Sequence, residues 1–251
     1  MRATLRPTGA TGDPPDLDRP PSLLGITIRR STVLGRFFLL YGIGISVVLG
    51  AVFAITPGGT FSALPYIVPI FGAVGSMGSL QVFSSDRIKG TLEYFLAYGV
   101  SSRRLFANFL VAAIVLMSLV VGIGESVAVG VYLARGRALS DILALAFGLY
   151  AVPMSFATAA FATMVGMYWS ALSSPRAGMN SPIGLAPFIG ILPPVAVLVS
   201  ITALAASGIV GSPTEYLAVA VTGAVIVAAA ALTLLALVGR LLRNERFLSP
   251  A

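Results

Sequence analysis

Six hydrophobic stretches, each long enough to cross a lipid bilayer, dominate this sequence. A helix needs about 20 mostly apolar residues to cross the hydrocarbon core. Only 10% of the residues are charged, whereas soluble domains carry about 25%. We therefore expect an all-α polytopic membrane protein, a six-transmembrane-helix bundle. Its spans should cover residues 37–56, 61–83, 105–133, 141–169, 183–207 and 215–239.

The two ends of the chain differ in composition from the hydrophobic middle. The first 22 residues contain five prolines and no apolar core, so they lack the pattern of a signal peptide. We expect residues 1–28 to be a disordered N-terminal tail, 29–240 the transmembrane domain and 241–251 a basic C-terminal tail. Membrane insertion should then begin at the first hydrophobic helix.

The basic residues predict the orientation of the bundle. Six spans place both termini on one side, together with the loops at 84–104 and 170–182. That side collects all of the 16 Lys and Arg residues except Arg135 and Arg137. Because basic residues accumulate on cytoplasmic ends, we expect both termini in the cytoplasm of a cell that carries this protein in its plasma membrane.

Prolines and small residues occur inside several of the predicted spans. Small residues such as Gly72 and Gly75 in the second span let helix backbones approach closely, which favours a packing role over a substrate-lining one. Single prolines are tolerated in transmembrane helices. The pair Pro193-Pro194 is more disruptive, and we expect a kink or a break in the fifth span.

Missing residue types and motifs exclude several function classes. The sequence has no Cys and no His, which removes disulfides, zinc sites built on those ligands and catalytic triads that use His. It also has no phosphate-binding loop of the G-x-x-x-x-G-K-[ST] type. The net charge of +7 comes without a basic stripe interleaved with aromatics, so we expect no nucleic-acid partner. We expect no enzyme, no metal and no cofactor bound by this chain.

The loop at residues 84–104 carries the most specific pattern. Thr91 followed by LEYFLAY predicts a short amphipathic helix, with Gly90 before it and Gly99 after it. Leu92, Phe95 and Leu96 share one face of this helix. Such a helix would lie along the membrane surface or in a groove of a cytoplasmic partner.

This loop resembles the one between the second and third spans of ABC type-2 exporter permeases. Members of that family carry an acidic-Arg pair, a Gly-Thr-Leu-Glu core, two hydrophobic residues and a Val-Ser. The counterparts here are Asp86-Arg87, Gly90-Thr91-Leu92-Glu93, Phe95-Leu96 and Val100-Ser101. The motif covers about 20 residues, and the six-span topology covers nearly the whole chain. The outer loops here are shorter than in many relatives, which leaves little room for an extracellular gate.

The resemblance implies a permease subunit of an ATP-driven ABC exporter. The segment 86–98 would then be the coupling helix that docks onto a separate ATPase subunit, which binds the ATP and Mg. The docking residues implied are Asp86, Arg87, Gly90, Thr91, Leu92, Glu93, Phe95 and Leu96. A second permease copy or a paralogue would complete a dimer within the lipid bilayer. The sequence does not identify the substrate.

Glu125 is the acidic residue that falls within the third hydrophobic stretch. Intramembrane acids are candidates for a functional role, so Glu125 is a possible intramembrane polar site. The alternative is that it marks where the span leaves the lipid, with Arg135 or Arg137 nearby. A stand-alone secondary transporter or channel is the alternative function, and it would need more polar groups inside the spans than this sequence shows.

Overall fold

The computed structural model describes residues 22–56, 60–172 and 186–241. Within these ranges the chain is helical apart from short turns, and it contains no strand. The helices are α1 (Leu23–Leu34), α2 (Arg36–Ile55), η1 (Thr60–Ala63), α3 (Leu64–Ile67), η2 (Val68–Phe71), α4 (Gly72–Ile88), α5 (Thr91–Ala97), α6 (Ser102–Ala134), α7 (Asp141–Leu145), η3 (Ala146–Ala151), α8 (Val152–Leu172), α9 (Ala186–Ala206) and α10 (Pro213–Leu241).

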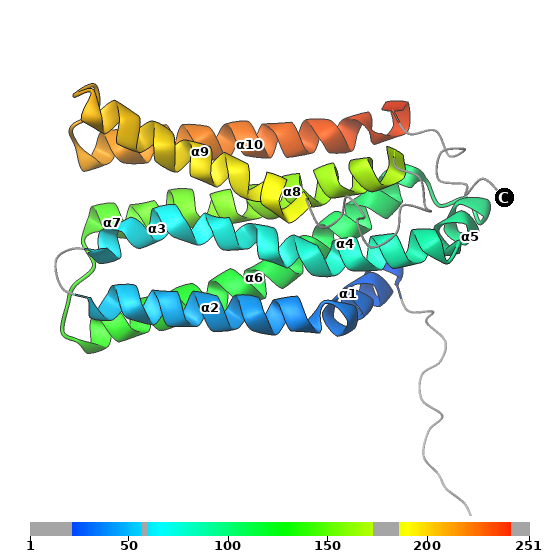
Figure 1. Cartoon of the computed structure of the whole chain (residues 1–251), viewed down its shortest axis with the longest axis horizontal. Coiled ribbons are helices and arrows are strands. Elements are labelled where there is room, and N and C mark those ends of the chain that lie inside the picture. Colours follow the sequence, from blue (N-terminus) through cyan, green and yellow to red (C-terminus); the bar gives the residue numbers. More distant parts are fainter. Residues whose placement is uncertain (1–21, 57–59, 173–185, 242–251) are drawn as a thin grey trace, which may run out of the picture.

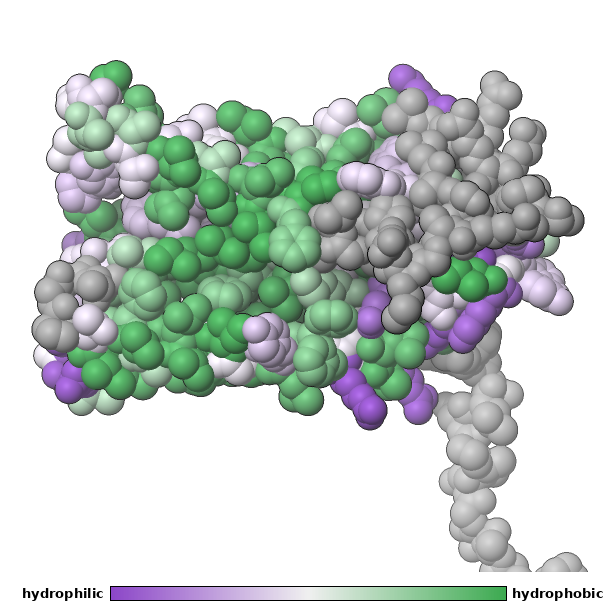
Figure 2. All heavy atoms as spheres, in the orientation of Figure 1, coloured by the Kyte–Doolittle hydropathy of each residue, from purple (hydrophilic) through white to green (hydrophobic). Residues whose placement is uncertain are grey.

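The predicted six-helix bundle is confirmed. Six helical segments are long and apolar enough to cross a membrane: Arg36–Ile55, Phe61–Ile88, Ser102–Ala134, Asp141–Ala171, Phe188–Ala206 and Pro213–Val238. They run side by side along the long axis of the molecule (Figure 1). Figure 2 shows a hydrophobic surface over the middle of the bundle and hydrophilic residues towards its ends. This surface pattern is the one that a lipid bilayer requires.

The spans divide into a central and a peripheral set. In the central spans, which contain α4, α6 and α8, half or more of the most apolar segment is buried. In α2, α9 and α10 that share is below a quarter. Helix α4 contacts α1, α2, α6, α8 and α9, so it lies at the centre of the described bundle.

Small residues bring the central helices into close contact. A Cβ atom added to Gly75 of α4 would lie 2.5 Å from Cβ and 2.6 Å from Cα of Met117 in α6. On α2 the residues at every fourth position, Gly42, Ser46, Gly50 and Ala54, are buried. Several buried hydroxyl groups in these spans donate to carbonyls of their own helix, as Ser76 does to Ala73, Ser79 to Ser76 and Thr163 to Ala159. The packing role expected for the small residues is therefore met in the structure.

Backbone irregularities fall in the second and fourth spans. In the second span, Pro65 is the second residue of the short helix α3 and Pro69 the second residue of the 3₁₀ turn η2, which leads directly into α4. In the fourth span, a π-helical segment (Ala146–Ala151) directly precedes Pro153 in α8. A wider turn at this point accommodates the carbonyl that a proline leaves without a donor.

Of the kink or break expected in the fifth span, the break does not occur in the described residues, and the kink stays a prediction. Helix α9 runs without interruption from Ala186 to Ala206, with Pro193 and Pro194 inside it. The fixed φ of proline is compatible with a helix, so each proline removes a hydrogen bond without ending the helix. The predicted start of this span, at 183–185, lies outside the described residues.

The boundary of the N-terminal tail also needs correction. Residues 23–28, which the sequence assigned to a disordered tail, belong to α1 (Leu23–Leu34). Ser22 caps this helix, because its hydroxyl accepts a hydrogen bond of 3.1 Å from the Gly25 N–H. The prolines that suggested disorder all precede this cap. The predictions for 1–21, and for 242–251 of the C-terminal tail, lie outside the described residues.

Candidate functional site

The short helix predicted at Thr91 is confirmed as α5. It begins after Gly90, which has a φ of +71°, and is followed by Gly99 with a φ of +81°. Both values fall in the left-handed region, which favours glycine. Figure 1 shows α5 at the end of the bundle where α1 begins and α10 ends. Apart from Arg135 and Arg137, the described basic residues belong to segments at this end.

The apolar face of α5 contacts the bundle itself. Leu92 is 1% exposed and lies in a buried cluster with Phe83, Leu105 and Phe106. Phe95 and Leu96 are partly buried against the same cluster. Leu92 therefore cannot dock onto a partner as the sequence suggested, and Phe95 and Leu96 offer a partner only part of their surface. The apolar face of α5 thus packs against its own chain, whereas the sequence predicted contact with the membrane surface or with a partner groove.

The opposite side of this loop exposes large side chains. Ile88 is 68% exposed, Tyr94 69% and Tyr98 81%. The rings of Tyr94 and Tyr98 stack with centroids 6.4 Å apart. We refer to Ile88, Tyr94 and Tyr98 as the tyrosine face. None of these three residues is among the docking residues predicted from the sequence, although the i, i+4 spacing of the two tyrosines indicates a shared helix face.

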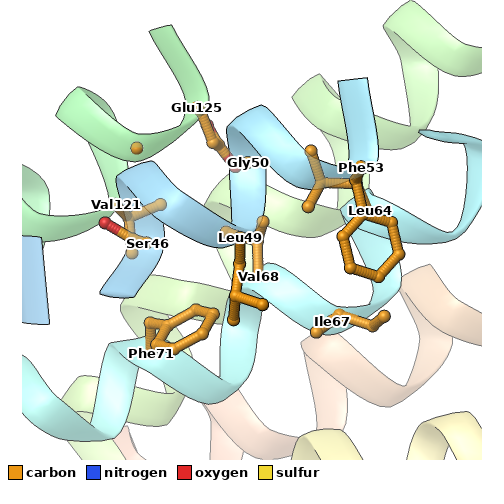
Figure 3. A pocket seen from close by; sticks show the side chains of 11 residues that line it. Ser46, Leu49, Gly50, Phe53, Leu64, Ile67, Val68, Phe71, Val121 and Glu125 are labelled. Carbon is orange, nitrogen blue, oxygen red and sulfur yellow. The ribbon is translucent and has the colours of Figure 1, made fainter. Parts of the chain in front are cut away.

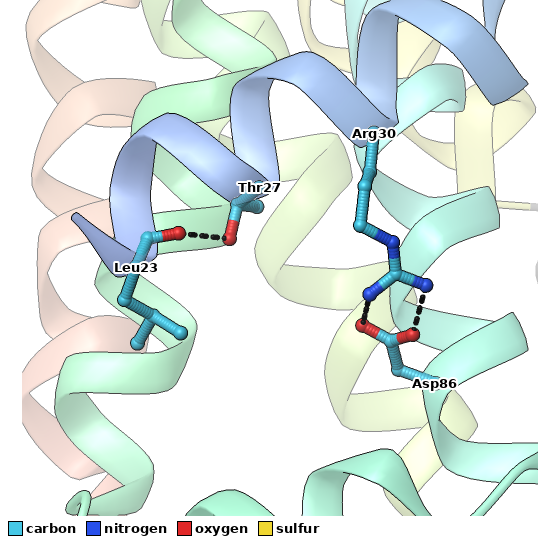
Figure 4. A network of polar contacts seen from close by, with 4 residues as sticks. All are labelled: Leu23, Thr27, Arg30 and Asp86. Carbon is cyan, nitrogen blue, oxygen red and sulfur yellow. Dashed lines mark hydrogen bonds and ion pairs between the residues drawn. The ribbon is translucent and has the colours of Figure 1, made fainter. Parts of the chain in front are cut away.

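Asp86 lies within the chain and not on its surface. Its side chain is 2% exposed and accepts two hydrogen bonds from Arg30 of α1, at 2.8 and 2.5 Å. Figure 4 shows this bidentate pair, which joins α1 to the last turn of α4. Its partner satisfies the carboxylate, so Asp86 is a structural residue in this position. The assignment of Asp86 to a docking surface is therefore wrong.

The other predicted docking residues have intermediate exposure. Arg87, Thr91, Glu93 and Gly90 are all partly buried. Ser101 caps the following helix, since its hydroxyl accepts from the Arg104 N–H at 3.3 Å. The loop is thus held on both sides, by Gly90 and α4 before it and by this cap after it. The loop presents its exposed side chains from a fixed backbone.

Replacing Leu92 by alanine tests its position in the core. We expect the free energy of unfolding to fall by about 3 kcal/mol, because the change removes a fully buried side chain and leaves a cavity. The change Tyr94→Ala, two residues away, should leave stability within about 0.5 kcal/mol, since an exposed side chain is lost. Denaturation in mixed micelles measures both. Equal stability of the two variants would contradict this placement.

Glu125 lies next to a small cavity between three spans. The cavity is bounded by α2, by the α3 and η2 segments and by α6, and encloses about 10 Å³. Figure 3 shows the Glu125 side chain extending from α6 toward Gly50 of α2. The cavity is lined by Ser46, Leu49, Gly50, Phe53, Leu64, Ile67, Val68, Phe71, Val121, Gly124 and Glu125. One carboxylate oxygen of Glu125 is buried without a hydrogen-bond partner among the described residues.

Glu125 does not mark the end of its helix. Helix α6 continues nine residues beyond it, to Ala134. Arg135 donates a 2.8 Å hydrogen bond to the Ile55 carbonyl, and Arg137 lies over the Tyr132 ring at 5.6 Å. The two arginines considered as neighbours of Glu125 thus make other contacts. That Glu125 marks the point where the span leaves the lipid stays a prediction.

Comparison of the chain with protein families, curated proteins and solved structures gives no match. No group of three or more acidic residues that could hold a metal ion occurs in the part of the chain that the structure describes. Two features of the described bundle are therefore candidate functional sites, the tyrosine face and the Glu125 cavity.

Proposed function

We propose that this chain is the permease subunit of an ATP-driven exporter, coupled to a separate ATPase through the loop that contains α5. The observation that carries the proposal is the tyrosine face. Ile88, Tyr94 and Tyr98 expose large hydrophobic surface at a basic end of the bundle, outside the apolar middle that lipid would cover. Tyrosine is among the residues that dominate binding at protein interfaces.

The position of α5 suits it to transmit movement. It follows α4 after a two-residue turn, and Leu92 anchors it in the cluster that includes Phe83 of α4. Helix α4 in turn contacts most of the other spans. A displacement of the tyrosine face by an ATPase would therefore reach the centre of the bundle. A transporter needs such coupling to alternate between two conformations.

The remaining parts of the proposal concern partners and place. The ATPase, which would bind ATP and Mg, is a separate subunit. Helices α2, α9 and α10 leave most of their residues unburied within one chain, which provides surface for lipid and for a second permease copy or paralogue. Under this proposal the protein resides in the plasma membrane, with the tyrosine face and both termini in the cytoplasm.

Co-purification tests the proposal. The chain is expressed with the ATPase encoded beside its gene, and the pair is isolated in detergent. We expect the ATPase to be retained by the unmodified chain and lost by the double change Tyr94→Ala, Tyr98→Ala, since these rings supply the exposed docking area. The change Tyr41→Ala is the matched control, because Tyr41 is 58% exposed on α2 within the apolar region. Retention of the ATPase by the double variant would refute docking at this face.

A stand-alone secondary transporter or channel is the second candidate. The observation in its favour is Glu125, an acidic group inside a span with an unpartnered oxygen. Uptake or efflux by the purified chain alone in liposomes, without any ATPase, would favour this candidate. Transport that requires both the ATPase and ATP would favour the exporter.

A further inference from the structure

The depth of the Glu125 carboxylate in the bilayer follows from its neighbour α2, taken as a helix that spans the hydrocarbon core. Gly50 of α2 contacts the same turn of α6, since a Cβ added to it would lie 3.0 Å from the Gly124 carbonyl oxygen. Gly50 precedes the end of α2 at Ile55 by five residues, which is about 8 Å along the helix. Helix α2 has 20 residues, about the length that the hydrocarbon core requires. The carboxylate is therefore within the apolar layer.

The lining of the cavity contains a single charge. Glu125 is the one ionisable residue among the lining side chains, and its buried oxygen has no donor among the described residues. A charged group in a low-dielectric site is costly unless an opposite charge accompanies it. One carboxylate without further carboxylates or carbonyl cages suits a monovalent organic cation better than a metal ion.

The walls of the cavity favour a cation with a hydrophobic body. Phe53 and Phe71 are two of the lining residues, and aromatic rings attract ammonium groups. The enclosed volume of about 10 Å³ accommodates one water-sized group. A primary ammonium head is of that size, whereas a trimethylammonium head is larger. The space thus selects for the head group of a primary amine.

The seam between α2 and the broken second span is the candidate route for the rest of such a molecule. Helix α2 packs closely along α6 but has few contacts with η1 and η2. The residues on the two sides of this seam have intermediate exposure. They are Leu49 and Phe53 on α2, and Ile67 and Phe71 on the broken second span. Val48 and Val52, beside them on α2, are exposed. An alkyl chain could leave the cavity between α2 and η2 and enter the lipid.

We propose that the Glu125 cavity binds the ammonium group of a lipophilic primary amine, with its alkyl chain between α2 and η2. Binding itself needs only this chain. The statement that such amines are the cargo depends on the exporter function proposed above.

Equilibrium binding of tritiated dodecylamine to the full chain in nanodiscs tests the proposal, with empty nanodiscs subtracted. Glu125→Gln keeps the shape of the side chain and removes its charge, and we expect an affinity lower by about 30-fold or more. Glu215→Gln is the matched control, because the exposed Glu215 accepts hydrogen bonds from Gly211 and Ser212 far from the cavity. It should bind as the unmodified chain does. Elution volume and melting temperature confirm that both variants are folded.

Two competitors with the same alkyl chain separate the effect of head-group charge from that of head-group size. Unlabelled dodecanol should fail to displace dodecylamine, and dodecyltrimethylammonium should displace it only at about tenfold higher concentration, because its head exceeds the enclosed space. Equal binding by the Glu125→Gln variant, or competition by dodecanol as strong as by dodecylamine, would overturn the proposal. Equal competition by the quaternary amine would overturn the size selection. The binding assay contains no ATPase, so its result does not depend on the exporter function. A chain that binds dodecylamine but retains no ATPase in the co-purification would refute the exporter function and leave amine binding intact.

Discussion

Replacing Arg30 by alanine is expected to lower the free energy of unfolding by about 3 kcal/mol, more than replacing Asp86 by alanine. The reason is the unequal burial of the pair, with 33% of the Arg30 side chain exposed and 2% of Asp86. Loss of Arg30 leaves a buried carboxylate without its partner, which costs about 3–5 kcal/mol in fully buried pairs. The lower end applies because Arg30 is partly hydrated already. Loss of Asp86 leaves an arginine that can turn to water.

The neighbouring Arg29 provides the control for this prediction. It is exposed on the same helix, so Arg29→Ala should change stability by no more than about 0.5 kcal/mol. Denaturation in mixed micelles compares the single variants with the double variant lacking both Arg30 and Asp86. We expect the double variant to be more stable than Arg30→Ala, because no buried charge remains. If Arg30→Ala behaves like Arg29→Ala, the ion pair does not hold α1 on α4.

The change Gly75→Ala should have an effect of similar size in the middle of the bundle. The added Cβ would lie 2.5–2.7 Å from Cβ, Cα and N of Met117, and two of these atoms belong to the α6 backbone. A backbone cannot move aside as a side chain can, so α4 and α6 must separate. We expect a loss of about 3 kcal/mol, the upper part of the usual range for overpacking.

Gly122→Ala on α6 is the matched control. A Cβ at Gly122 would have no neighbouring atom within 4 Å, and the position is exposed. Alanine is the better helix former there, so stability should stay equal or rise by up to about 1 kcal/mol. A melting curve in detergent separates the two outcomes. A Gly75→Ala variant as stable as Gly122→Ala would show that α4 and α6 are farther apart than described.

The sequence predicted the six spans because apolar length is a property of each helix by itself. It also located α5, since Gly90 and Gly99 mark its ends in the chain. The surface that the apolar face of α5 contacts could not be predicted from such sequence signals. Whether Leu92 meets lipid, a partner or Phe106 depends on where α6 lies, and a helical pattern shows a face without showing what covers it.

The same limit applies to charged residues. Asp86 resembled a docking residue because its partner, Arg30, is 56 positions away in the chain. The first half of α1, residues 23–28, was assigned to a tail because the prolines before it dominated the composition. The pair Pro193-Pro194 favoured a kink or a break, whereas the α9 helix continues through both prolines. Each of these outcomes depends on contacts between helices, which composition and periodicity do not contain.

The hydroxyl groups that bond back to their own helix have a consequence for biosynthesis. Ser76 and Ser79 are buried in α4, a helix that packs in part against α6 and α8, which the ribosome makes later. Their hydroxyls already have acceptors at Ala73 and Ser76 within α4. The second span can therefore leave the translocon and stay in lipid before the later helices are made, because the Ser76 and Ser79 hydroxyls are already hydrogen-bonded. The order of insertion is in this way independent of the order in which the helices assemble.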